Sequence, residues 1–273
     1  MPELPEVETV RAGLAPVLEG ARIVRATIAD PRLVRPFAPE AVAAELEGER
    51  VACVERRGKY LIVGFESGRV LLVHLRMTGS FRHGAAGTLA EDPHRRAVLR
   101  LDNGSDVVYR DVRRFGTWEL LEDGELAGYF ARRLGPEPLG RLPAATLAAR
   151  LRGRRAPLKA ALLDQRTLAG LGNIYADEAL WAARLHPLRP AGSLDDDEVR
   201  RLHRGVRSAL RRGIARQGAS LRDYAQPNGA SGGMQDEFRV YGRDGEPCPR
   251  CRTPIAKTRL GGRGTHFCPT CQR

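Results

Sequence analysis

Two hydrophobic periods divide the chain into a first and a second half. Between residues 21 and 121, short apolar runs rich in branched residues follow one another, and turn signals such as Ser67-Gly68 and Asn103-Gly104 separate them. Beyond residue 143 the apolar positions recur at helical spacing. This change of period predicts an α+β protein, with an antiparallel sandwich or barrel followed by a helical region.

The segment before these strands predicts one amphipathic helix. Val7, Val10 and Leu14 recur at helical spacing and share one face. Pro5 suits the first helical position, and Gly20 suits the exit of the chain from the helix. We expect this helix to pack its apolar face against the sheets.

The second half begins after residues 134–143, a stretch of prolines and glycines that predicts a linker. Its longest helix is predicted to begin with Ser193 as N-cap, with an apolar stripe from Val199 to Leu210. Arginines occupy the other face, which is most simply a solvated surface. Residues 222–236 are rich in Gly, Asn, Pro and Ser and too long for a simple connector, so a lid and a disordered loop both remain open.

Charge narrows the class of partner. The 273 residues include 45 Lys and Arg against 33 Asp and Glu, which gives a net charge of +12. This excess favours a nucleic-acid partner, bound between the two halves; a merely basic protein is the alternative. No apolar run of 18 residues predicts a membrane span, and acids stand where a signal peptide needs a basic region. We therefore expect a cytoplasmic protein.

Four of the five cysteines lie in the last 26 residues, as Cys248, Cys251, Cys268 and Cys271. Their spacing, C-x2-C-x16-C-x2-C, is typical of a structural zinc site. Two thiolate pairs on tight turns can supply a closed tetrahedral set for one Zn²⁺. Two disulfides are less consistent with an intracellular chain, and a redox dithiol is less consistent with a duplicated motif.

The opening residues MPELPEVETV carry a candidate nucleophile. Methionine before a small residue is usually removed, which would leave Pro2 as a free secondary amine. An α-amino group titrates near pKa ~8, against ~10.4 for lysine, so part of it is unprotonated at neutral pH. Glu3 is placed to move protons beside it. An incidental Met-Pro start is the alternative.

The chain resembles the formamidopyrimidine-DNA glycosylases in motifs that run from residue 2 to the last cysteine. They are PELPEVE, RRGKYL, HLRMTGS, DVRRFG, LDQRTLAGLGNIYADEALW, VYGR and GGRGTHFCPTCQ, in that family's order. The resemblance implies an N-terminal β-sandwich with flanking helices, a C-terminal helix–two-turn–helix domain and a zinc finger. The implied domains are residues 1–134, a linker 135–148, a helical domain 149–236 with a lesion-capping loop, and a finger 237–273.

The resemblance also implies an activity and the residues that perform it. Pro2 would displace an oxidised purine from damaged double-stranded DNA and hold the sugar as a Schiff base, and β- and δ-elimination would follow. Glu3 would be the general acid and base, with Glu6 in supporting contacts, and Lys59 would reach the phosphate beside the lesion. A monomer associated with the nucleoid is expected.

Two further groups of residues follow from the resemblance. His74, Asn173, Tyr241 and Arg263 would hold phosphates, although His74 could be a satisfied core histidine and Tyr241 a packing residue. Met77, Arg113 and Phe115 would fill the space left by an extruded nucleotide; without the resemblance, Met77 and Phe115 would be taken as core residues. The contacts of the loop 222–236 with the damaged base do not follow from the sequence.

Two rival functions remain. The endonuclease VIII type of the same family prefers oxidised pyrimidines, but Leu4 and the trio of Met77, Arg113 and Phe115 favour the purine branch. A zinc-ribbon protein that binds DNA without cutting it is the other rival.

Overall fold

The computed structural model describes residues 1–221 and 224–273, which form two compact units. The N-terminal unit comprises residues 1–132 and 217–233, and the C-terminal unit comprises residues 133–216 and 234–273. Among the described residues, no helix combines the length and apolar character needed to cross a membrane.

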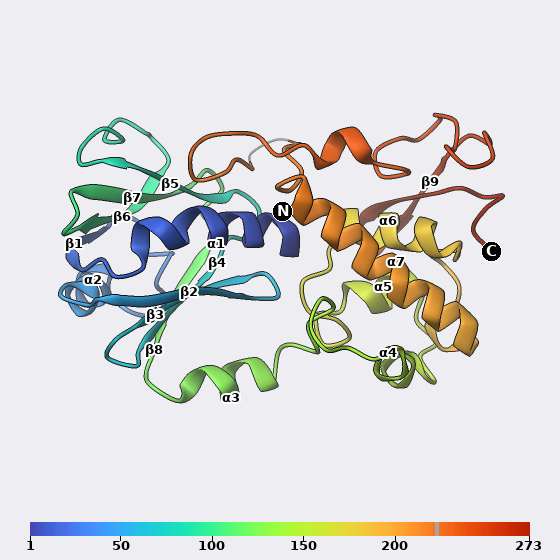
Figure 1. Ribbon diagram of the computed structural model, residues 1–273, viewed down its shortest axis with the longest axis horizontal. Coiled ribbons are helices and arrows are strands. Elements are labelled where there is room, and N and C mark those ends of the chain that lie inside the picture. The colour runs from blue at the N-terminus through green and yellow to red at the C-terminus, as the bar shows by residue number, and fades with distance from the viewer. Residues whose placement is uncertain (222–223) are drawn as a thin grey trace. The chain divides into compact units, whose positions relative to one another are not determined.

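Within its described residues, the N-terminal unit contains eight strands and three helices (Figure 1). The helices are α1 (Leu4–Leu18), α2 (Pro39–Leu46) and α3 (Glu125–Ala131). The strands are β1 (Ile23–Ile28), β2 (Val51–Arg57), β3 (Tyr60–Phe65), β4 (Val70–His74), β5 (Gly79–Ala85), β6 (Arg95–Leu101), β7 (Ser105–Asp111) and β8 (Thr117–Leu121).

These strands form two antiparallel sheets, which confirms the predicted sandwich. One sheet has the order β1-β6-β7-β5 and the other the order β2-β3-β4-β8. Buried residues of both sheets and of α1 belong to one hydrophobic core, to which α1 contributes Val7, Val10 and Leu14. The predicted helical face of this first segment is therefore the face that is buried. The chain leaves α1 at Gly20, whose φ of +80° is easily adopted only without a Cβ.

A segment distant in sequence lies against the edge strand β5. The backbone N–H of His83 donates to the carbonyl of Pro227, and a Cβ on Gly13 of α1 would lie 3.0 Å from the Pro227 ring. Residues 217–233 thus belong to the N-terminal unit, whereas the sequence placed them with the helices. Part of the predicted loop, residues 222–223, lies outside the described residues.

The C-terminal unit contains four α-helices, two short 3-10 helices and one hairpin within its described residues. They are α4 (Ala144–Leu151), α5 (Leu158–Leu163), α6 (Asn173–Ala183), η1 (Ala191–Ser193), α7 (Asp196–Ala215), η2 (Met234–Glu237), β9 (Ala256–Leu260) and β10 (Arg263–Phe267). The hairpin β9–β10 is antiparallel and packs by β10 against α6.

The long helix α7 begins two residues later than predicted for a Ser193 cap. Ser193 ends η1, and Asp195 is the N-cap: its carboxylate accepts from the backbone N–H of Glu198 at 2.7 Å. Glu198 in turn accepts from the N–H of Asp195, which completes a capping box. The prediction was wrong because two capping candidates stand two positions apart, and only the reciprocal pair with Glu198 distinguishes them.

Glycines let α7 lie close to α6. A Cβ on Gly205 would be 2.6 Å from the carbonyl oxygen of Ala179, and one on Gly213 would be 2.5 Å from the ring of Tyr175. Neither glycine has a positive φ, so their role is close approach rather than backbone freedom. This pairing gives the first turn of α6 a rigid support.

Candidate functional site

The N-terminus of α1 brings three predicted residues together. Pro2, Glu3 and Glu6 are all buried, while Met1 remains 47% exposed. Glu3 is the N-cap of α1 with extended backbone, and its N–H donates to Glu6 Oε2 at 2.9 Å. The Glu3 side chain accepts in return from the backbone of Glu6. A capping box therefore holds the peptide that follows Pro2 in one orientation.

Glu6 also ties this helix start to the segment 217–221. Its Oε1 accepts from the N–H of Ala219 at 2.8 Å, in a buried hydrogen bond. Gly218 has a φ of +80°, and a Cβ there would lie 2.8 Å from Glu6 Cγ. The Tyr224 hydroxyl donates to the Glu6 carbonyl at 3.4 Å, and burial raises the pKa of Tyr224. Gly218, Ala219 and Tyr224 were not predicted as partners of Glu6, because nothing local links them to residue 6.

Lys59 and His74 lie beside each other at one end of the second sheet, Lys59 in the turn before β3 and His74 at the end of β4. Lys59 follows the turn residue Gly58, directly before β3, and Tyr60 at the start of β3 is in register with His74 at the end of β4. Both Lys59 and His74 are buried, and the Tyr60 and His74 rings meet edge to face at 4.7 Å. His74 is therefore a buried residue that lies beside the turn carrying Lys59.

His74 is neutral at physiological pH. Burial lowers its pKa to about 3, and the cations of Arg76 and Lys59 act in the same direction. Nδ1 accepts from the N–H of Arg76 at 3.0 Å, so Nε2 carries the hydrogen. The ring can therefore donate one neutral hydrogen bond but supplies no positive charge.

Met77, Arg113 and Phe115 lie at the surface on two loops of this unit. Met77 is 39% exposed and Phe115 is 50% exposed, so neither is a core residue. The Arg113 guanidinium stacks over the Phe115 ring, with 4.7 Å between Cζ and the ring centroid. Exposed apolar side chains beside a cation are suited to contact a partner that has both apolar and polar groups.

The loop that carries Arg113 and Phe115 is held by Asp111. One carboxylate oxygen accepts from the N–H of Arg113 at 3.2 Å and from the Thr78 hydroxyl, and the other accepts from the N–H of Gly116 at 2.7 Å. Thr78 follows Met77 directly, so Asp111 connects both loops. Asp111 was not predicted, although an aspartate at a strand end before a turn is a recognisable local signal.

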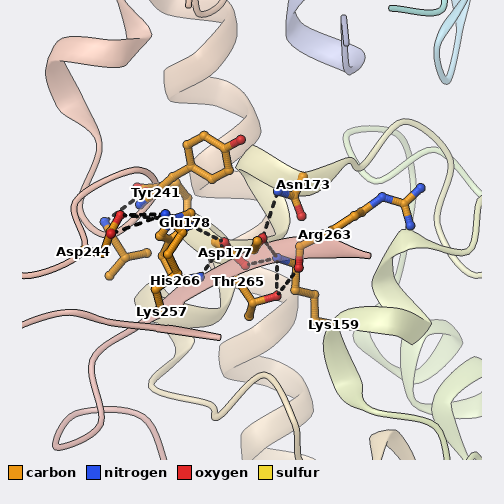
Figure 2. Close-up of polar contacts among 12 residues, drawn as sticks. Lys159, Asn173, Asp177, Glu178, Tyr241, Asp244, Lys257, Arg263, Thr265 and His266 are labelled. Carbon is orange, nitrogen blue, oxygen red and sulfur yellow. Dashed lines mark hydrogen bonds and ion pairs between the residues drawn. The ribbon is translucent and has the colours of Figure 1, made fainter. Parts of the chain in front are cut away.

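Asn173 and Arg263 come together in the C-terminal unit. Asn173 is the first residue of α6, and its Nδ2 donates at 3.0 Å to the carbonyl of Gly264, which follows Arg263 on β10 (Figure 2). Arg263 follows Gly261 and Gly262, both with positive φ. Its side chain is exposed and has no hydrogen bond or ion pair within the described part of the chain. It is therefore available to an anion.

Tyr241 is held nearby through its backbone. Glu178 of α6 is fully buried and accepts from the N–H groups of Arg239, Val240 and Tyr241, at 2.9, 3.0 and 3.1 Å. The Tyr241 ring lies 5.1 Å from the ring of His266 on β10. Glu178 was not predicted, because a glutamate in a helix is normally a surface residue.

The four predicted cysteines form one cluster. The Sγ atoms of Cys248, Cys251, Cys268 and Cys271 all lie within 4.8 Å of one another. Four thiolates around Zn²⁺ at about 2.3 Å stand about 3.8 Å apart, so this donor set fits the ion. With four protein ligands the zinc is structural.

Comparisons with known proteins agree with this geometry over the whole chain. Residues 1–118 match the family model of the formamidopyrimidine-DNA glycosylase N-terminal domain, residues 134–225 match its H2TH domain, and residues 245–273 match the zinc finger found in FPG and IleRS. The formamidopyrimidine-DNA glycosylase of Roseiflexus sp. (strain RS-1) is 47% identical over 276 residues, covering 100% of both chains.

Solved structures of FPG and MutM superpose on the whole chain. An FPG variant from Lactococcus lactis, in complex with DNA containing Fapy-dG, superposes with a TM-score of 0.93 at 38% identity, covering 100% of both chains. A MutM in complex with DNA containing carbocyclic 8-oxo-G superposes with a TM-score of 0.92, also at 38% identity and full coverage of both chains.

Fold, site and matches together define a DNA glycosylase of base-excision repair that also has AP lyase activity. Within this class, the chain belongs to the formamidopyrimidine-DNA glycosylase family. The predicted architecture of sandwich, helix–two-turn–helix domain and finger is thereby confirmed, as is one structural zinc.

Proposed function

We propose that this enzyme removes oxidised purines, 8-oxoguanine and formamidopyrimidines, from duplex DNA and then cuts the strand on both sides of the sugar. The observation that carries the proposal is the start of α1, where the capping box of Glu3 and Glu6 holds the peptide after Pro2. The relatives crystallised with Fapy-dG and 8-oxo-G DNA support the choice of lesion.

Pro2 acts as the nucleophile once Met1 has been removed. Its nitrogen bonds to C1′ of the damaged nucleoside while the bond from C1′ to the base breaks, and Glu3 supplies the proton that the leaving base takes. Opening of the sugar ring then gives an iminium, which accepts electrons. Loss of a C2′ proton expels the 3′ phosphate, and a second elimination expels the 5′ phosphate.

The remaining predicted residues hold the DNA. Lys59 and His74 contact phosphates in the N-terminal unit, where Lys59 supplies the charge and His74 the neutral donor. Asn173, Tyr241 and Arg263 contact phosphates in the C-terminal unit, and the amides at the start of α6 favour the same anion. Of these five residues only Lys59 and Arg263 are charged, so they account for two of the roughly five or six phosphates whose neutralisation would give log K against log salt a slope of about −5.

Met77, Arg113 and Phe115 replace the extruded nucleotide. Extrusion costs a few kcal/mol, and apolar side chains that enter the stack offset part of that cost. Met77 fills the vacated space, Phe115 wedges into the facing step, and Arg113 donates to the orphaned cytosine. Their exposure and the stacking of Arg113 on Phe115 support these roles.

The predicted domain boundaries, a monomeric state and association with the nucleoid are part of the same proposal. Family matches that end at residue 118, span 134–225 and begin at 245 support separate sandwich, helical and finger regions. A monomer suffices because both proposed groups of DNA contacts come from one chain.

Two measurements on purified enzyme test the proposal. Borohydride reduction during incubation with 8-oxoguanine duplex should produce a stable covalent complex, since reduction traps an iminium. Binding without crosslinking or scission would favour the non-catalytic rival. Excision of 8-oxoguanine opposite cytosine should exceed that of thymine glycol, and the reverse preference would favour the endonuclease VIII type.

A further inference from the structure

Lys159 of α5 is a fully buried lysine outside the proposed catalytic centre. Its side chain is 0% exposed, which is rare for lysine unless the ammonium is paired. Nζ lies 2.7 Å from Asp177 Oδ1, 2.9 Å from the Gly264 carbonyl oxygen and 2.9 Å from Thr265 Oγ1 (Figure 2). The ammonium thus donates to two oxygens and forms an ion pair with a third, so its charge is compensated within the protein.

The Gly264 carbonyl connects Lys159 to both proposed phosphate contacts of this unit. The same oxygen accepts from Asn173 Nδ2 at 3.0 Å, and Gly264 is the residue after Arg263. Figure 2 shows Lys159 and Asn173 meeting at this strand while the Arg263 side chain extends away from it. The position of one carbonyl therefore determines where the Asn173 amide lies and where the Arg263 side chain starts.

Asp177 completes the connection from the other side. Its Oδ1 pairs with Lys159, and its Oδ2 accepts from the backbone N–H of His266 at 2.9 Å. Asp177 stands four positions after Asn173 and hence one turn along the same face of α6. The buried pair thus joins α5, α6 and β10 at the point where α6 begins.

We infer that Lys159 is a positioning residue for phosphate binding by Asn173 and Arg263, an inference that rests on the proposed function of those two residues. A buried ion pair is weak evidence for stability, because apolar residues of similar volume often serve as well. What an apolar pair cannot supply is a donor that fixes the Gly264 carbonyl. Misplacing a binding group by about 1 Å can cost on the order of a hundredfold.

The double variant Lys159→Met, Asp177→Asn tests this inference. It removes both buried charges together, and the amide introduced at position 177 would still offer an oxygen to the His266 N–H. We expect KM for a lesion duplex to rise by about 10- to 100-fold, with kcat at saturating DNA changed less than about threefold, because the chemistry belongs to the N-terminal unit. The slope of log K against log salt should become shallower by up to about 1, because Arg263 is charged and Asn173 is not.

Lys257→Met is the matched control. Lys257 lies on β9 of the same hairpin, half exposed, and pairs with Asp244 at 3.2 Å. This change removes one lysine from the same region, whereas the Gly264 carbonyl accepts from Lys159 and Asn173, so KM should change less than about threefold. Zinc content by mass spectrometry and the melting temperature of each variant show that the finger remains folded.

Two outcomes distinguish failure of this inference from failure of the proposed function. If Asn173→Ala with Arg263→Ala weakens binding but the Lys159 variant does not, the positioning role is wrong and the phosphate contacts stand. If Asn173→Ala with Arg263→Ala leaves binding unchanged, the proposed phosphate roles themselves are wrong. Combining all four changes should cost little more than Asn173→Ala with Arg263→Ala, and full additivity would overturn the inference.

Discussion

The start of α1 and the junction of α6 with β10 both carry proposed site residues, yet they are held in different ways. At α1 the holding partners, Glu3 and Glu6, are three positions apart. At the junction, Lys159 and Gly264 are 105 positions apart, and Asn173 and Gly264 are 91 apart. The capping box at α1 can form with one helical turn, although Glu6 is also held by Ala219, 213 positions away. The junction requires the whole C-terminal unit.

On the proposed roles, the arrangement at α1 serves the chemistry and the arrangement at the junction serves DNA binding. A capping interaction contributes about 1 kcal/mol and acts on the residues beside it, so changes at α1 should alter the reaction and leave the rest of the fold intact. The buried pair at the junction acts on groups from three elements, so changes there should alter DNA affinity. Four predictions test this separation, in order of decreasing effect.

Pro2→Gly should give the largest effect. The effect should be confined to crosslinking and strand scission. With processing blocked so that Met1 is retained, as intact mass can verify, borohydride crosslinking and strand scission should fall by roughly a thousandfold or more, as expected for loss of a nucleophile. DNA affinity should change less than about threefold. Pro5→Ala, which changes a proline of the same helix start but spares the amine, should crosslink normally. An undiminished crosslink in Pro2→Gly would show that another residue, for example Lys59, is the nucleophile.

Cys268→Ser should lower DNA affinity strongly and leave the stability of the N-terminal unit almost unchanged. Losing one of four thiolates should release the zinc and lower DNA affinity by about a hundredfold, because the hairpin that carries Arg263 loses its anchor. Urea unfolding of the N-terminal unit should shift by less than about 0.5 kcal/mol. Cys53→Ser, at a cysteine on β2 outside the cluster, should retain zinc and affinity. Normal DNA binding by zinc-free Cys268→Ser would show that the finger is dispensable.

Gly218→Ala should slow the reaction through Glu6. Its φ of +80° disfavours alanine by about 1–2 kcal/mol, and the added Cβ would meet Glu6 Cγ at 2.8 Å. We expect single-turnover crosslinking to slow by about tenfold as Glu6 moves from Glu3. Gly20→Ala has the same φ of +80° with nothing within 4 Å, so it should lose similar stability and keep its rate. Equal crosslinking rates in the two variants would show that the 217–221 segment does not influence the reaction.

His74 should give the smallest effect, in the pH dependence of stability. The unfolded chain takes up a proton at this residue near pH 6.5, but the folded protein does so only near pH 3. Between these values the unfolded state binds more protons, so stability falls as pH drops below about 6.5, by up to about 1.4 kcal/mol per pH unit. His74→Gln should lack this component in urea unfolding at pH 5.0 and 7.5. Parallel pH profiles for both proteins would contradict a neutral buried ring.

Local signals made part of the site predictable. The position of Pro2 and Glu3 beside a helix start, the cysteine spacing and Asn173 after Gly172 were all visible without tertiary contacts, since each depends on neighbours within a short stretch of chain. The N-cap of α7 was wrong by two residues because Ser193 and Asp195 compete locally. Gly218, Glu178 and Asp111 were missed because their partners lie on other segments or because their residue types are usually exposed.

By itself, the sequence determined the order of sheet-rich and helical regions, the helix at residues 4–18 and the donor set for zinc, because hydrophobic period and ligand spacing are short-range properties of the chain. Only the tertiary structure decided that His74 stays neutral, that Glu6 joins residues 3 and 219, and that Lys159 supports Asn173 and the strand after Arg263. Each of these depends on desolvation or on hydrogen bonds between segments far apart along the chain, and such terms exist only after those segments have packed together.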